Sequence, residues 1–236
     1  MTTIGRSAAP AAWAGDSAVL GAMIVALVPM GLLHLLGSTA VDPVTAPISD
    51  YVAVAGGYAL IGVSAVALAV AGLVLAAGLG AARLPGARRV GSVLVVWAAA
   101  LTVVAVFPTN VPGTPVTVTA WVHRLGGAVV FGLLPVIVAL VARSGARDAH
   151  WASVVPGLRR WAAVSGLLTL VFLAGQAPVG FGLGPALPGI GTVQRLMFVL
   201  TAVLLVVLAR AASTVSAAHP PAPVPLRGPA GCGGAA

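Results

Sequence analysis

The sequence predicts an all-α membrane protein, in which six transmembrane helices form one bundle. Of the 236 residues, 60% are hydrophobic and only 7% are charged, whereas a soluble domain carries about 25% charged residues. So few charges cannot cover a surface that faces water, and lipid must therefore be the main solvent. The apolar residues also form six runs long enough to cross a bilayer, separated by short polar or Pro- and Gly-rich segments.

The six runs occupy residues 17–210, between a cytoplasmic N-terminal segment over 1–16 and a tail over 211–236. We expect the tail to be disordered, because it consists mainly of Ala, Pro and Gly. The expected spans are residues 17–37, 51–79, 90–107, 121–142, 161–176 and 192–210. An even number of spans puts both termini on the same side of the membrane.

The first run has a competing interpretation as a cleaved signal peptide, because Ser38-Thr39-Ala40 resembles a small-residue cleavage site. Its apolar part is longer than a usual signal core, and Pro29 and His34 interrupt it. These two features favour a retained first span.

The second span has a clear start signal, since Pro47 and then Ser49 precede its apolar run. Ser49 is the expected N-cap residue, which places Asp50 in the first helical turn. The later spans are separated by a basic turn at 83–89, a Pro-rich loop at 108–115, a basic loop at 143–160 and a Gly- and Pro-rich loop at 178–191.

The basic residues, all of them Arg, are distributed unevenly between the two sides of the predicted bundle. Ten fall on the side of the termini, namely Arg6, Arg83, Arg88, Arg89, Arg143, Arg147, Arg159, Arg160, Arg210 and Arg227. Only Arg124 and Arg195 fall on the other side. The positive-inside rule then places both termini in the cytoplasm and the protein in the plasma membrane. The net charge of +8 is explained in this way, and we expect no nucleic-acid partner, because the arginines form no continuous basic stripe.

An internal repeat relates the third and fourth spans to the fifth and sixth. Residues 85–89, Pro-Gly-Ala-Arg-Arg, match residues 156–160, Pro-Gly-Leu-Arg-Arg, at an offset of 71. At the same offset, residues 122–125 match residues 193–196 and align Arg124 with Arg195. The pattern favours duplicated helical hairpins, with chance similarity in an Ala-, Val-, Leu- and Gly-rich sequence as the alternative.

A polar group gathers on the predicted outer side, around the segment Val41–Tyr51. This segment holds Asp42 and Asp50, two of the four acidic residues in the chain. Arg124 and Arg195 are expected in the first turns of their helices, where the helix dipole disfavours a cation, and on the side that normally avoids Arg. The ligand-binding set predicted from the sequence is Arg124, Arg195, Asp50, Asp42, Tyr51 and Gln194.

Three functions are compatible with this group. The first is a binding protein or transporter whose two Arg side chains hold an anionic molecule or lipid headgroup. The second is a membrane-embedded enzyme acting on a lipid-like substrate, with Asp50 and His123 as candidate catalytic acid and base. The third is a structural subunit without a ligand, in which Asp50 pairs with one Arg or the arginines reach lipid phosphates. A transporter needs a polar path, and the inner halves of the spans offer little beyond Ser64, Thr102, Ser165 and Thr169.

The sequence predicts no cofactor and no metal. His34, Asp50 and His123 are the only candidate ligand set near the outer side, and no His-x-x-x-His or similar spacing supports it. Cys232 is the single cysteine, so an internal disulfide is excluded. The expected partners are membrane lipids and an anionic small molecule or lipid headgroup.

Several short motifs on successive spans resemble a bacterial and archaeal membrane family, catalogued as domain of unknown function 998. They are Ile48-Ser49-Asp50-Tyr51, Phe107-Pro108-Thr109-Asn110, His123 and Gln194-Arg195-Leu196. The resemblance covers about residues 17–210 and implies a six-helix integral membrane protein, without implying an activity. Asn110 stands where the family pattern implies Asp, which leaves Asp50 more isolated.

Overall fold

The computed structural model describes residues 15–180, 183–184 and 186–218. Within these residues the chain forms six long helices and one short 3-10 helix, without a strand. They are α1 (Gly15–Gly37), η1 (Ile48–Ala53), α2 (Gly57–Ala81), α3 (Ala87–Val106), α4 (Val118–Gly145), α5 (Val155–Gly180) and α6 (Ile190–Ala218). All six long helices are long and apolar enough to cross a membrane. The predicted six-helix membrane bundle is confirmed.

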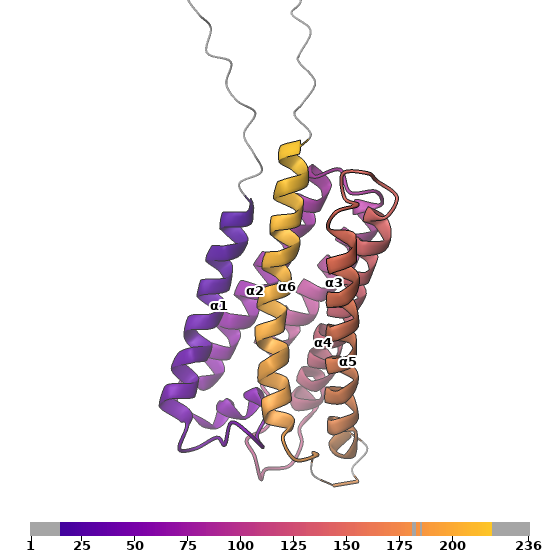
Figure 1. The fold of residues 1–236 in the computed structure, drawn as a ribbon. Helices are drawn as coiled ribbons and strands as arrows, with labels where there is room; N and C mark the ends of the chain where they lie inside the picture. The colour runs from indigo at the N-terminus through magenta and orange to yellow at the C-terminus, as the bar shows by residue number, and fades with distance from the viewer. Residues whose placement is uncertain (1–14, 181–182, 185, 219–236) are drawn as a thin grey trace, which may run out of the picture.

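The helices run up and down along one common direction, so the bundle has two ends (Figure 1). The start of α1 and the end of α6 lie at one end, here called the terminal end. The loops that leave α1, α3 and α5 lie at the opposite end, here called the distal end. In the most apolar 18-residue stretch of each helix, 50% of the residues are buried in α2 and in α6, but only 22% in α5. Helices α2 and α6 therefore form the centre of the bundle.

Small residues allow the central helices to approach closely, and a few polar side chains join them. A Cβ on Gly72 of α2 would lie 2.9 Å from the ring of Trp97 on α3. The Trp97 indole in turn donates to the carbonyl of Val130 on α4 over 2.9 Å. The Ser64 hydroxyl on α2 donates to the Ala26 carbonyl on α1 over 2.8 Å. Such small-residue contacts and interhelical hydrogen bonds are what hold helices together in lipid.

The start of α2 differs from the sequence prediction. Residues 48–53 form the separate helix η1, and α2 begins only at Gly57. Ser49 therefore does not cap α2, and Asp50 lies in η1 rather than in the first turn of α2. The reason is a sharp turn at Gly56, which has a φ of 74° that glycine adopts without strain. Tyr51 lies in η1, and its side chain is fully buried.

The end of α6 also differs from the prediction. The helix continues to Ala218, eight residues beyond the expected end at Arg210. Ala211, Ala212 and Val215 are buried, at the spacing of one helix face, and this packing extends the helix. The predicted disorder over 219–236, and most of the N-terminal segment, residues 1–14, lie outside the described residues.

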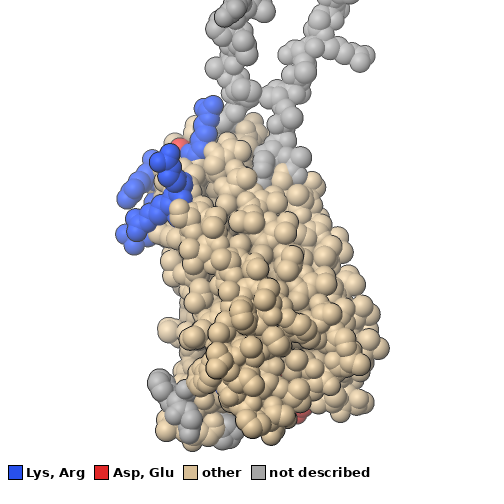
Figure 2. All heavy atoms as spheres, turned by 180° about the vertical axis from the view of Figure 1, so that it is seen from behind, with Lys and Arg blue, Asp and Glu red and all other residues tan. Residues whose placement is uncertain are grey.

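The arginines of the described chain gather at the terminal end, as Figure 2 shows from one side. Arg124 and Arg195 lie instead near the distal end of α4 and α6. They occupy the second turns of these helices rather than the first turns predicted from the sequence, because α4 begins at Val118 and α6 at Ile190.

The predicted repeat agrees with the helix boundaries. Adding 71 to the bounds of α3 gives 158–177, against 155–180 for α5. Adding 71 to the bounds of α4 gives 189–216, against 190–218 for α6. The duplication of hairpins thus gains support from the lengths and starts of four helices, while the two aligned arginines have different partners.

Candidate functional site

The segment between α1 and η1 is bound to the start of α6 at the distal end. The backbone N–H of Ile48 donates to Oε1 of Gln194 over 2.6 Å, and that of Thr192 donates to the carbonyl of Val44 over 3.2 Å. Gly191 permits this close approach, because a Cβ there would lie 2.9 Å from the Val44 carbonyl oxygen. The segment therefore forms a fixed wall rather than a free loop.

Arg195 is enclosed by neutral acceptors. Its Nε donates to Nε2 of His34 over 2.7 Å. Its Nη1 donates to the carbonyls of Ala46 over 2.8 Å and Gly191 over 3.0 Å. Its Nη2 donates to the hydroxyl of Tyr51 over 3.3 Å, and the guanidinium carbon lies 5.6 Å from the centre of that ring. The guanidinium thus joins α1, η1, α6 and the connecting segment.

The hydrogen bonds of His34 determine its tautomer. Nδ1 lies 2.7 Å from the carbonyl oxygen of Met30, which can only accept, so Nδ1 carries the proton. Nε2 faces the guanidinium of Arg195, which can only donate, so Nε2 is the acceptor. The imidazole is therefore neutral. Its ring also packs against Tyr51, with the ring centres 5.1 Å apart.

Arg124 has far fewer partners. Its Nη2 donates to Oδ1 of Asn110 over 3.1 Å, and its guanidinium carbon lies 5.6 Å from the ring of Trp121. The side-chain Nδ2 of Asn110 donates hydrogen bonds to the carbonyls of Val111 and Thr114, each over 3.2 Å, and these fix the orientation of the amide. Within the described residues, most of the N–H donors of Arg124 have no acceptor, in contrast to those of Arg195.

Asp50 is half-buried in η1. Burial raises the pKa of its carboxyl to about 6, although the positive charges of Arg124 and Arg195 act in the opposite direction. No ion pair within 4.0 Å joins Asp50 to an arginine among the residues described. The ion pair expected from the sequence is therefore absent there, because neutral acceptors hold Arg195 and Asn110 holds Arg124.

Asp42 and Tyr51 have local structural roles. Asp42 is exposed, and its carboxylate accepts the backbone N–H of Val44 over 2.8 Å. That hydrogen bond, together with one from Thr45, lowers the pKa of the Asp42 carboxyl. Tyr51 is buried against His34 and Arg195. Both residues shape the wall of the site.

His123 faces the interior of the bundle. Its side chain is 9% exposed, and Nδ1 donates to the carbonyl of Phe107 at the end of α3 over 2.8 Å. No hydrogen bond between His123 and Asp50 is found in the described chain. The two candidate catalytic residues therefore do not form a hydrogen-bonded pair.

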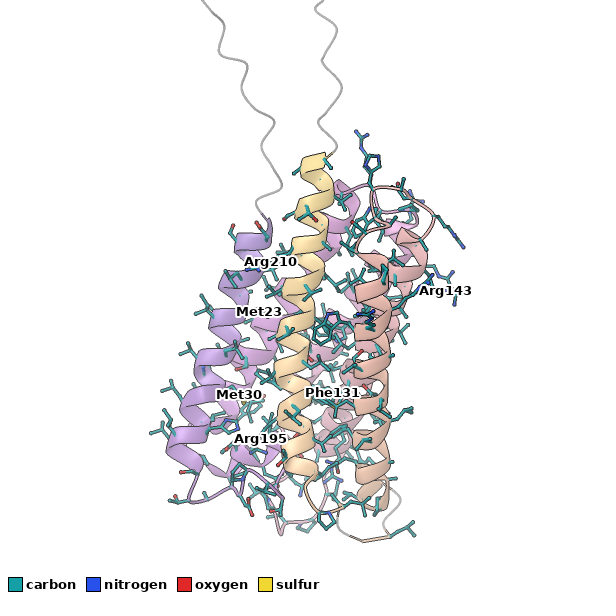
Figure 3. All side chains as sticks on the ribbon, in the orientation of Figure 1. Met23, Met30, Phe131, Arg143, Arg195 and Arg210 are labelled. Atoms are coloured by element: carbon teal, nitrogen blue, oxygen red, sulfur yellow. The ribbon has the colours of Figure 1, made fainter. Side chains whose placement is uncertain are left out.

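A cavity of about 90 Å³ lies between the helices in the distal half of the bundle. Figure 3 shows Met30 on α1, Phe131 on α4 and Arg195 on α6 in this half. The lining is mostly apolar, and it consists of Met30, Ile48, Ser49, Ile61, Ser64, Ala65, Leu68, Leu101, Val104, His123, Gly127, Val130, Phe131, Gln194, Phe198 and Thr201. Two of these residues, Ser49 and His123, directly precede Asp50 and Arg124 in the chain.

Of the residues that line the cavity, the sequence predicts only His123 and Gln194 as site residues, and it predicts neither of the partners that hold the arginines. Asn110 was noticed only as a departure from a family pattern, and His34 only as a poor metal ligand. A signal was present in both cases, since each is a polar residue at the end of an apolar run. Within the described residues no group of three His, Cys, Asp or Glu side chains could hold a metal ion.

Comparison with known proteins agrees with this architecture. No curated protein matches the chain. No solved structure matches it either. The family described as "Protein of unknown function (DUF998)" matches residues 17–211, which include α2 to α5 and most of α1 and α6. The chain therefore belongs to the DUF998 family.

Proposed function

We propose that this protein is a plasma-membrane binding protein for an anionic amphiphile, with its site at the distal end and its termini in the cytoplasm. The observation that carries the proposal is the distal cavity, whose mostly apolar lining includes Ser49 and His123, the residues that precede Asp50 and Arg124 in the chain. An apolar group would enter the cavity, and an anionic group would meet Arg124.

Arg124 is the better anion contact of the two distal arginines. Arg195 already donates to four acceptors, whereas Arg124 donates to one. A guanidinium with free donors binds a phosphate or carboxylate through two parallel hydrogen bonds. Arg195 has a different role, because it holds the wall of the site in position.

The cavity limits the apolar part of the ligand. Its volume of about 90 Å³ is smaller than the roughly 300 Å³ of the smallest usual drug-sized sites. It therefore takes a short apolar group or one end of a longer chain. Gly127 lines it without a side chain, and no atom lies within 4 Å of the place where a Cβ would stand.

A one-sided site is favoured over a transport path. The polar residues deeper in the spans give their hydroxyl hydrogens to backbone carbonyls. Ser64 donates to Ala26, Thr102 to Ala98, Ser165 to Trp161 and Thr169 to Phe131. These hydroxyls stabilise helices rather than line a continuous polar route to the terminal end.

The orientation follows from the arginines. Ten of the 12 arginines lie in segments assigned to the side of the membrane that holds the termini, and two lie on the distal side. This asymmetry supports cytoplasmic termini, because Arg is retained on the cytoplasmic side of membranes. The distal site would then face the outer leaflet and the outside of the cell.

The test uses the purified protein in nanodiscs of neutral lipid, with hexyl phosphate as the probe. Inorganic phosphate and hexyl glucoside serve as controls, each lacking one half of the amphiphile. We expect hexyl phosphate to raise the melting temperature of the wild type more than either control does. Arg124→Gln should abolish the response, and Gly127→Leu should reduce it to that of inorganic phosphate. Arg143→Gln, an exposed arginine at the terminal end, should behave as wild type.

One observation favours a second candidate, a membrane-embedded enzyme. The carboxyl of Asp50 has a pKa of about 6, close to the value that suits an acid or base at neutral pH. Release of inorganic phosphate from hexyl phosphate by wild type, but not by Asp50→Asn, would favour the enzyme. If no probe binds and none is converted, both proposals fail and a structural subunit remains.

A further inference from the structure

A second hollow lies at the terminal end, far from the distal cavity. It is a groove of about 340 Å³ between the first turns of α5 and the last turns of α6. It is lined by Ser153, Val154, Gly157, Leu158, Trp161, Val207, Arg210, Ala211 and Thr214. Figure 3 shows Arg210 on α6 in the terminal half of the bundle. The groove therefore combines an apolar floor with one cation.

Arg210 has no counter-charge within the described residues. Its side chain is exposed and forms neither a hydrogen bond nor an ion pair with any of them. The two acidic residues nearest the terminal end are otherwise engaged, since Asp16 accepts the N–H of Ser17 and Asp148 accepts the N–H of His150, each over 2.8 Å. Arg210 therefore places an unpaired positive charge in a mostly apolar groove, and an anion bound there would neutralise it.

The rest of the chain cannot supply an acidic side chain. The four acidic residues of the sequence are Asp16, Asp42, Asp50 and Asp148, and all four are among those already placed. Residues 1–14 and 219–236 contain neither Asp nor Glu. Within this sequence, no acidic side chain remains for Arg210, and an anion from another molecule would supply its counter-charge.

Two features favour a position of the groove at the headgroup level of a membrane. Trp161, which lines it, is an aromatic residue of the kind that gathers at membrane interfaces, and Arg159 and Arg160 precede it. From Arg210, α6 continues for eight residues, which corresponds to a rise of about 12 Å. Arg210 thus lies inside the helix end, where its long side chain reaches lipid phosphates.

We propose that this groove binds one anionic phospholipid of the phosphatidylglycerol class, from the leaflet at the terminal end. Arg210 binds the phosphate, and Trp161, Leu158 and Val207 contact the glycerol and the first methylene groups of the acyl chains. The hydroxyl of Thr214 donates to the Ala211 carbonyl over 2.9 Å, so its oxygen can accept a headgroup hydroxyl. If the proposed orientation is right, this is the cytoplasmic leaflet, whose anionic lipids attract arginine.

The experiment is native mass spectrometry of the full chain, purified in detergent and mixed with phosphatidylglycerol or phosphatidylcholine of identical acyl chains. We expect phosphatidylglycerol to be retained and phosphatidylcholine to be lost. Arg210→Gln should lower the retained phosphatidylglycerol about tenfold, because it removes a charge-assisted hydrogen bond to the phosphate. Arg143→Gln, an exposed arginine at the same end, should retain it as wild type does.

Three results would overturn the proposal. Equal retention of the two lipids, or an equal loss in both arginine variants, would mean that the groove does not recognise an anionic headgroup. A change in the number of chains per particle in Arg210→Gln would mean that a second copy of the chain covers the groove. Glycerol 3-phosphate, added as a soluble competitor, should leave the bound lipid in place, because it cannot fill the apolar floor. None of these results depends on the distal site.

Discussion

Nε of Arg195 donates a hydrogen bond to Nε2 of His34 over 2.7 Å, and the two residues are 161 positions apart in the chain. This contact joins the distal ends of α6 and α1, and the segment between α1 and η1 closes around it. It holds a cation at the membrane boundary with neutral acceptors only. The repeat-equivalent Arg124 has no such enclosure, so two arginines at matching positions have separate roles.

The first prediction concerns this contact. His34→Ala removes the acceptor and leaves an N–H of Arg195 without a partner, which costs about 1–3 kcal/mol. We expect a lower melting temperature in detergent. His34→Gln is the matched variant, because its amide oxygen can still accept, and it should retain most of the stability. Equal melting temperatures for His34→Ala and wild type would contradict the structural role of the contact.

The second prediction concerns the partner of Arg124. Asn110→Asp places a carboxylate where an amide oxygen now accepts from Arg124 over 3.1 Å. The new ion pair should compete with an external anion, so the response to hexyl phosphate should fall at least tenfold. Asn110→Ala, which removes the acceptor without adding charge, should bind as well as wild type or better. Unchanged binding in Asn110→Asp would mean that Arg124 is not the anion contact.

The third prediction concerns Asp50 and pH. Burial raises the pKa of its carboxyl from 3.8 to about 6, so the folded protein favours the protonated form. Tighter proton binding by the folded state adds stability that is fully present below pH 3.8 and is lost as the pH rises through about 6. Because the side chain is partly exposed, the loss should be only about 1 kcal/mol.

Asp50→Asn cannot ionise, so it should melt at a higher temperature than wild type above pH 7. The difference should disappear as the pH approaches 4. Thermal melts of both proteins between pH 4 and 8 provide the measurement. A difference that stays constant over this range would show that ionisation of Asp50 is not its cause.

The fourth prediction concerns the close contact between α2 and α3. Gly72→Ala puts a methyl group 2.9 Å from the ring of Trp97, which is itself held by the Val130 carbonyl. Because the ring cannot move without losing that hydrogen bond, we expect a destabilisation of about 1–3 kcal/mol. Gly80→Ala is the control in the same helix, since a Cβ there meets nothing within 4 Å. Similar melting temperatures for the two variants would refute this packing.

The fifth prediction concerns orientation. Val111 is exposed in the distal loop between α3 and α4. Val111→Cys in a Cys232→Ser background should react with an impermeant thiol reagent on intact cells. The native Cys232, the single cysteine of the chain, should react only after permeabilisation. The reverse pattern would place the termini outside, and the distal site with its ligand on the cytoplasmic side.

The six helices could be predicted because each apolar run is long enough to span a bilayer by itself. The boundaries of α2 and α6 could not, since they depend on packing. Ser49 has the local chemistry of an N-cap, yet it lies in η1, and the turn at Gly56 delays the start of α2 to Gly57. Similarly, the Ala-rich composition after Arg210 predicts disorder, but Ala211 and Ala212 are buried against the bundle and the helix continues.

The sequence by itself determined the architecture, the segregation of arginines and the position of the polar group at the end of the bundle opposite the termini, because hydropathy and charge act locally along the chain. Tertiary structure alone decided what each charged residue contacts. Opposite charge suggested Asp50 as the partner of an arginine, but His34 and Asn110 hold the two arginines. The physical reason is that hydrogen bonds need partners within about 3 Å, and only the docking of α1, η1, α4 and α6 sets those distances.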